Sequence, residues 1–377
     1  MNILDLRYRF DSPEEYGFSI LDSDQTEKRQ EIRSRNLSRS VLIAPELFPE
    51  IAGIIDQVRA ALIPDRQIEG YVFNSGEGQA YSFGEGMEGT VTLALSSGLI
   101  ERFSSCEIQF IVGHEISHTL FGHLRYPVPD GERPPLENFN LLALTRAREI
   151  TADRIGFIAC GSAESSFRAM LKLASGLSDE HIRFDLATYL DQARELLSIG
   201  GSRTQLLSTH PMITSRIKAL MWFEMSDGYY EFTGKRGKAP LSRKKLEDKV
   251  SRELAAAAGH GLARMNQAAA NQAVLWGILG IFLADGTLQQ QEQVLLRKTF
   301  GEKAAHRAVE LAVRSNSSDL EAKLTEKVYS ASRLPASVRS KILTTIEALA
   351  SLTETGDEED RLMEGYRSAL KIPSDEA

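Results

Sequence analysis

The sequence Gly-His-Glu-Ile-Ser-His occupies residues 113–118, inside an apolar run that extends over residues 108–124. Residues four apart lie on the same face of an α-helix, so His114 and His118 are predicted to project side by side. Two imidazoles with this spacing can bind one Zn²⁺ ion, and Glu115 can then reach the metal-bound water as a general base. The stretch therefore predicts a helix that carries two metal ligands and a base.

The predicted helix has its own start signal and an apolar surface. Ser104 and Glu107 have the spacing of a capping box, and apolar residues then occur on most faces. A helix of this kind is buried, and buried ionisable groups need partners or a metal ion. The alternative is a chance match on a core helix whose histidines are only hydrogen-bonded. The presence of a third metal ligand would distinguish a metal site from such a chance match.

A second predicted helix, over residues 139–159, carries the candidate third ligand. Glu149, Ala152, Asp153 and Gly156 share one face of it. The small residues allow another helix to approach closely, which would bring Glu149 to the metal. Two histidines and a glutamate with one open position form a catalytic rather than a structural zinc site. Asp153 is placed to accept a hydrogen bond from a ligand histidine. Alone, the two acids would also fit a solvated surface.

Three further side chains are candidate site residues. His123 follows the second histidine of the motif by five residues, whereas Met-turn zinc peptidases need six, so it is predicted to be a satisfied helix-end residue. Pro211 is predicted to begin another helix, with His210 at its mouth and Arg216 inside it. Either side chain can donate to the oxyanion of a tetrahedral intermediate. The alternative for His210 is a helix cap at the surface.

Composition limits the class of protein. The 377 residues are 42% hydrophobic and 25% charged, with a net charge of -8, which is typical of a soluble globular protein and speaks against nucleic-acid binding. Cys106 and Cys160 cannot form a disulfide framework and are predicted to be reduced core residues of a cytoplasmic protein. No secretory signal is visible, and the longest apolar run, residues 273–284, is too short for a membrane span.

The chain is predicted to contain a polar arm at residues 1–40, a metal-binding domain at 41–227, a basic linker at 228–245 and an all-α domain at 246–377. The predicted fold class is α+β: a mainly helical domain with a small β-sheet, followed by the all-α domain.

A small sheet is expected before the metal helix. Residues 68–74 and 79–84 predict a hairpin, and residues 90–95 predict a further strand. Such a sheet can offer its edge to an extended peptide.

Three ordered motifs together resemble the CAAX prenyl protease and HtpX-like family of zinc metallopeptidases, which are gluzincins. The matching residues are 114–118, 149–153, 208–211 and 216–217, with a lead-in at 95–99. Many members of that family have membrane-spanning helices, and none is visible here. The resemblance therefore does not extend to membrane-protein or prenylated substrates.

The resemblance implies that His114, His118 and Glu149 bind one Zn²⁺ per chain and that Glu115 activates water. It also implies that Asp153 supports a metal ligand and that His210 and Arg216 assist binding of the substrate or transition state.

In the C-terminal third, residues 283–287 with Glu292 and Leu295 are similar to the signature of TerB-like helical domains, although glutamines stand at 289–291 where that signature has acids. The alternative is a generic helical bundle. The clearest helical segments are residues 254–258, 268–284, 288–298 and 342–352.

These observations predict a zinc metalloendopeptidase that cleaves a protein or peptide substrate, with a possible protein partner on its C-terminal domain. One alternative is a catalytically silent zinc-binding module that acts through that domain. Glu115 argues against it, because a structural zinc site has no use for a base. Another alternative is a zinc hydrolase that acts on a small amide.

Overall fold

A computed structural model describes residues 2–21, 26–85, 88–130, 133, 135–198, 213–258, 260–284, 286–314, 324, 326–352 and 357–370. The chain divides into two compact units. The first comprises Met1–Asp11, Ile20–Val128 and Leu142–Gly259, and the second comprises Ser12–Ser19, Pro129–Leu141 and His260–Ala377.

The first unit contains a four-stranded sheet in the order β1-β2-β4-β3. The strands are β1 (Val41–Leu42), β2 (Ile68–Phe73), β3 (Ala80–Glu85) and β4 (Glu88–Ser96). β4 pairs in parallel with β2 and antiparallel with β3, while β1 pairs antiparallel with β2. The strand predicted at residues 90–95 is confirmed. The predicted hairpin is wrong, because β4 lies between β2 and β3.

The central place of β4 follows from its composition. Residues 91–96 are all buried, so both faces of this strand are covered. A strand buried on both faces is rich in apolar residues, as Val91, Leu93 and Leu95 are here, whereas β2 is buried only at its two central residues. This strand lies between β2 and β3 in the sheet.

The helices of the first unit are α1 (Thr26–Arg39), α2 (Pro49–Leu62), α3 (Ser97–Arg102), α4 (Ser105–Leu120), most of α5 (Pro135–Cys160), α6 (Ala163–Ser175), α7 (Leu186–Ser198), α9 (Ile213–Glu224), α10 (Asp227–Thr233) and α11 (Arg243–Ala258). Short 3-10 turns are η1 (Ile3–Leu6), η3 (His123–Arg125) and η4 (Asp179–His181). The predicted helices at 104–124 and 139–159 correspond to α4 with η3 and to α5.

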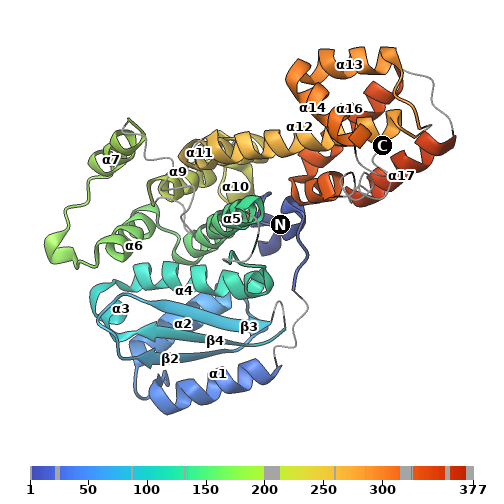
Figure 1. Cartoon of the computed structure of the whole chain (residues 1–377). Coiled ribbons are helices and arrows are strands. Elements are labelled where there is room, and N and C mark those ends of the chain that lie inside the picture. Colours follow the sequence, from blue (N-terminus) through green and yellow to red (C-terminus); the bar gives the residue numbers. More distant parts are fainter. Residues whose placement is uncertain are drawn as a thin grey trace. The chain divides into compact units, whose positions relative to one another are not determined.

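The metal helix α4 packs on one face of the sheet. It contacts β3, β4, α2 and α6. Ser82 of β3 bonds to α4, whereas its neighbour Tyr81 bonds to Asn36 of α1 through its hydroxyl. Successive side chains of a strand point to opposite faces, so α4 and α1 cover opposite sides of the sheet. Figure 1 shows the same arrangement.

The N-terminal residues differ from the polar arm that the sequence predicts. Ile3, Leu6 and Tyr8 are buried in the main core, and the Tyr8 hydroxyl lies 2.9 Å from the Ser251 hydroxyl of α11. Because charged residues surround these three apolar residues in the sequence, the average composition of the segment is polar and does not reveal that they are buried. Residues 2–11 are part of the packed unit.

The end of the first unit also lies beyond the predicted boundary. α10 occupies part of the predicted linker, and α11 carries Leu246 and Val250 into the main core. The compact unit therefore continues to Gly259.

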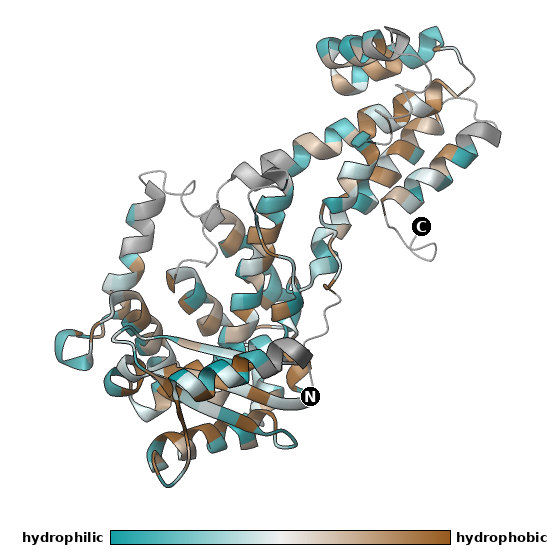
Figure 2. Ribbon diagram, turned by 60° about the horizontal axis from the view of Figure 1, so that its bottom comes forward, coloured by the Kyte–Doolittle hydropathy of each residue, from teal (hydrophilic) through white to brown (hydrophobic). Residues whose placement is uncertain are grey.

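The second unit is all-helical in its described parts, as predicted. It contains η2 (Pro13–Tyr16), α12 (His260–Phe282), α13 (Gln290–Phe300), α14 (Glu302–Arg314), η5 (Ala331–Arg333), α16 (Ala336–Ala350) and α17 (Asp357–Ala369). Its own core centres on the second half of α12, where Leu275, Ile278 and Leu279 meet Ile342 and Ile346 of α16. Figure 2 shows this apolar stretch of α12. Asp285, within the TerB-like signature, lies outside the described residues.

None of the described helices combines the length and apolarity that crossing a bilayer requires.

Candidate metal site

Two glycines allow α4 and α5 to cross in close contact. A β-carbon on Gly156 would lie 2.6 Å from the carbonyl oxygen of Phe110, and one on Gly113 would lie 2.6 Å from the β-carbon of Ala159. Both distances are too short for a real β-carbon, so only glycine fits at these positions. The close approach expected from the small face of α5 is present, and it brings Glu149 beside the histidines of α4.

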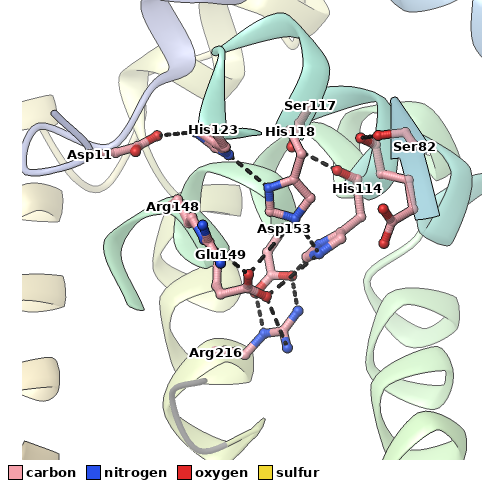
Figure 3. Close-up of polar contacts among 11 residues, drawn as sticks. Asp11, Ser82, His114, Ser117, His118, His123, Arg148, Glu149, Asp153 and Arg216 are labelled. Carbon is pink, nitrogen blue, oxygen red and sulfur yellow. Dashed lines mark hydrogen bonds and ion pairs between the residues drawn. The ribbon is translucent and has the colours of Figure 1, made fainter. Parts of the chain in front are cut away.

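Three side chains from the two helices converge on one point (Figure 3). The Nε2 atoms of His114 and His118 are 3.3 Å apart. The Glu149 carboxylate lies 3.6 Å from the Nε2 atom of His114 and 3.8 Å from that of His118. Ligands placed about 2.0–2.1 Å from a tetrahedral Zn²⁺ are about 3.3–3.4 Å from one another. The separations and the donor atoms therefore fit a zinc ion.

Glu115 lies next to this point. His114, Glu115 and His118 offer ligand atoms that are all within 4.8 Å of one another. Burial, assisted by the charge of the neighbouring Glu149 and opposed by that of His114, raises the pKa of Glu115 to about 7. A carboxyl group with a pKa near neutrality can both accept and return a proton.

Asp153 orients the first histidine. Its Oδ1 atom lies 3.0 Å from Nδ1 of His114, and Arg216 donates to the same carboxylate from Nε at 2.7 Å and from Nη2 at 2.5 Å. Burial alone would raise the pKa of Asp153, but the charge and hydrogen bonds of Arg216 lower it below its ordinary value. Asp153 is therefore a carboxylate that accepts a hydrogen bond from the N–H at Nδ1 of His114. The Nε2 lone pair of His114 then points into the site.

The charges around His114 favour a cation. Burial lowers the pKa of His114, but the hydrogen bond to Asp153 and the charge of Glu149 outweigh burial and raise it. Arg216 also lies 3.7 Å from the Glu149 carboxylate through Nη1. The carboxylates of Glu149 and Asp153 thus face the guanidinium groups of Arg216 and, at 4.0 Å from Glu149, Arg148.

The second histidine has a different partner. The Nδ1 atom of His118 lies 2.8 Å from Nδ1 of His123, and Nε2 of His123 lies 2.9 Å from Oδ2 of Asp11. Burial, with the neighbouring His114, lowers the pKa of His118 well below its ordinary value, which favours the neutral ring that binds metals. His123 is a buried, hydrogen-bonded residue just after α4. Sequence reasoning missed Asp11, because no spacing links it to the motif.

The remaining predicted residues divide into two groups. Arg216 lies on α9 and is brought to Asp153 and Glu149, where its guanidinium is engaged with carboxylates. His210 and the Ser-Thr-His-Pro motif at residues 208–211 lie outside the described residues.

Comparison with known proteins bears on the same segment. No curated protein gives a match to this chain. Residues 46–129 and 135–222, which carry α4, α5 and α9, match the profile of peptidase family M48, and peptidases of that family depend on zinc. This part of the chain is therefore similar to zinc metallopeptidases of the HtpX and CAAX type.

Proposed function

We propose that the protein is a zinc-dependent endopeptidase in which His114, His118 and Glu149 bind one Zn²⁺ per chain. The observation that carries the proposal is the convergence of these three donors at separations of 3.3 to 3.8 Å. When bound, Zn²⁺ polarises the peptide carbonyl and makes water acidic enough to be deprotonated near neutral pH.

Glu115 is the general base in this proposal. Its carboxylate takes a proton from the attacking water, and the resulting carboxyl group gives that proton to the amine that leaves. The near-neutral pKa that burial produces suits both steps.

Asp153 and Arg216 are positioning residues. Asp153 holds His114 in the tautomer that presents Nε2, and Arg216 holds Asp153 with two donors. Because Nε and Nη2 of Arg216 are used in this way, its contribution is to the ligand set rather than to the oxyanion. His210 keeps the predicted role of assisting the substrate or transition state.

The substrate is a protein or peptide segment in extended form, bound along β3. Among the described strands, β3 pairs only with β4, so its other edge has free backbone groups. Ser82 of β3 bonds to the carbonyl oxygen of Glu115, which ties this strand to the catalytic turn of α4. A peptide added to the edge of β3 would therefore run beside Glu115.

The C-terminal helical domain, which resembles TerB-like domains, binds a protein partner, and the protein acts in the cytoplasm. Support for the binding role comes from its separate core and from a cavity of about 780 Å³ that Phe300 and Ile342 help to line.

The test is mass-spectrometric analysis of a peptide library incubated with the zinc-loaded protein, with Glu115→Gln and Glu101→Gln run beside it. Glu101 is an exposed acid on α3 and serves as the matched control. We expect cleavage by the wild type and by Glu101→Gln, and none by Glu115→Gln at unchanged zinc content. Cleavage by all three proteins would exclude Glu115 as the base. Zinc binding without any cleavage would favour the silent module.

A further inference from the structure

A buried chain of hydrogen bonds connects the N-terminal segment to the second histidine of α4 (Figure 3). Asp11 is completely buried, and His123 is 2% exposed. Oδ2 of Asp11 lies 2.9 Å from Nε2 of His123, and Nδ1 of His123 lies 2.8 Å from Nδ1 of His118. Asp11 is 107 residues before His118 in the sequence, so folding alone joins them.

The chain has only one consistent arrangement of protons when both rings are neutral. A carboxylate can only accept a hydrogen bond, so Nε2 of His123 must carry the proton and donate a hydrogen bond to Asp11. Nδ1 of His123 is then an acceptor, and Nδ1 of His118 must donate to it. The Nε2 lone pair of His118 is thereby directed toward His114 and Glu149.

The His123 ring is held in place by its neighbours. It stacks on Phe121 with ring centroids 5.8 Å apart and contacts Tyr126 at 5.1 Å. Both residues are buried. Because the ring cannot turn freely between them, its Nδ1 atom stays directed at His118.

Stability alone does not account for Asp11. Its Oδ1 atom is buried with no hydrogen-bond partner among the described residues, and the nearest cation, Arg7, lies 3.6 Å from Oδ2. Tyr126 donates to the backbone carbonyl of Asp11. A buried carboxylate with one unpaired oxygen costs folding free energy, so its place against His123 calls for another reason.

We propose that Asp11 and His123 are positioning residues that fix the tautomer and orientation of His118 for metal binding. This rests on the proposed ligand role of His118. Asp153 serves His114 directly, whereas Asp11 serves His118 through one intervening ring. Loss of such an outer partner commonly weakens metal affinity about 10-fold to 100-fold.

The test is the zinc affinity of the full-length protein, measured by competition with a chromogenic chelator. Asp11→Asn keeps the shape of the side chain, but its amide can donate as well as accept, so the tautomer is no longer fixed. We expect zinc binding to weaken about 10-fold to 100-fold. Asp5→Asn, which changes an exposed acid of the same segment, should bind zinc as the wild type does. Unchanged affinity of Asp11→Asn would overturn the inference.

A double-mutant cycle tests the route. In the His123→Phe background, Asp11→Asn should cause no further loss of zinc affinity, because Asp11 acts only through His123. His123→Asn, which keeps an acceptor near the position of Nδ1, should bind zinc more tightly than His123→Phe. Equal losses in both backgrounds would show that Asp11 acts independently of His123 and would overturn the proposal.

An NMR measurement on the metal-free protein tests the tautomer of His118 directly, so that a loss of zinc affinity caused by misfolding is not mistaken for a positioning effect. The ¹⁵N shifts of the labelled imidazoles report directly which nitrogen of His118 is protonated. We expect a proton on Nδ1 in the wild type and a mixture of tautomers in Asp11→Asn, and a proton on Nε2 in the wild type would contradict the inference. His118→Ala separates this result from the proposed function. If His118→Ala binds zinc as the wild type does, His118 is not a ligand and the proposed function fails. If His118→Ala loses zinc binding but Asp11→Asn does not change it, His118 remains a ligand and only the positioning role of Asp11 fails.

Discussion

Gly113 and Gly156 meet where α4 and α5 cross, so that a β-carbon on Gly113 would lie 3.1 Å from the α-carbon of Gly156. This contact sets how near Glu149 comes to the two histidines. The obstacle to a larger residue is backbone as well as side chain, because a β-carbon on Gly156 would also meet the carbonyl oxygen of Phe110. The helices must separate to accept any larger residue.

Gly156→Ala should therefore destabilise the protein by about 1–3 kcal/mol and weaken zinc binding, because it overpacks the crossing and moves Glu149 outward. Urea denaturation and chelator competition measure the two effects. Gly53→Ala is the matched control, since Gly53 is exposed on α2 and a β-carbon there would touch nothing within 4 Å. That change should be neutral or stabilising by about 0.5–1 kcal/mol. A Gly156→Ala protein as stable as the wild type would contradict the tight crossing.

The two helices and their facing residues could be predicted because helical spacing is local. Four-residue steps placed His114 above His118, and the steps along α5 placed Glu149 on the same face as Gly156. The order of the strands could not be predicted in the same way. Alternation identifies a strand but says nothing of its partner, so β2 and β3 were paired with each other although β4 separates them.

Asp11 escaped prediction for a related reason. It lies in a charge-rich segment, and only the burial of Ile3, Leu6 and Tyr8 brings it to His123. Contacts of this kind depend on tertiary packing, which a single sequence does not encode in any spacing. Arg216 was identified from its motif, but its partner Asp153 became apparent only from their distance.

Glu149→Ala should remove or strongly weaken zinc binding, because it deletes one of three proposed ligands. Asp153→Ala should lower zinc affinity by less, about 10-fold to 100-fold, because it removes only the hydrogen bond that orients His114. Chelator competition on both variants gives the order of the losses. Glu164→Ala, at an exposed position of α6, is the control. Full zinc occupancy in Glu149→Ala would remove Glu149 from the ligand set.

Arg216→Lys should weaken zinc binding about tenfold despite keeping the charge. A lysine ammonium cannot reproduce the two parallel hydrogen bonds that Nε and Nη2 make to Asp153. Asp153 would then hold His114 less firmly. Comparison of zinc affinity with the maximal rate of peptide cleavage separates the two roles considered for Arg216. A loss of rate at unchanged zinc affinity would favour the direct role in the transition state.

The start of α4 is held by a buried ion pair whose loss should affect folding but not the metal. Lys172 of α6 donates to Glu107 at 2.7 Å, both side chains are 1% exposed, and the same carboxylate accepts from the backbone of Ser104. Asp179, a second partner of Lys172, is half exposed and offsets the buried charge less well.

Glu107→Gln should therefore destabilise the metal-free protein by about 3 kcal/mol, because it leaves the Lys172 ammonium buried without its closest buried countercharge. The capping bond to Ser104 survives, since a glutamine oxygen can still accept it. Zinc affinity should stay within twofold of the wild type, because Glu107 lies two helical turns before His114. Urea denaturation with and without zinc checks both statements, with Glu101→Gln as the exposed control. A large loss of zinc affinity would mean that the start of α4 and the metal site do not fold independently.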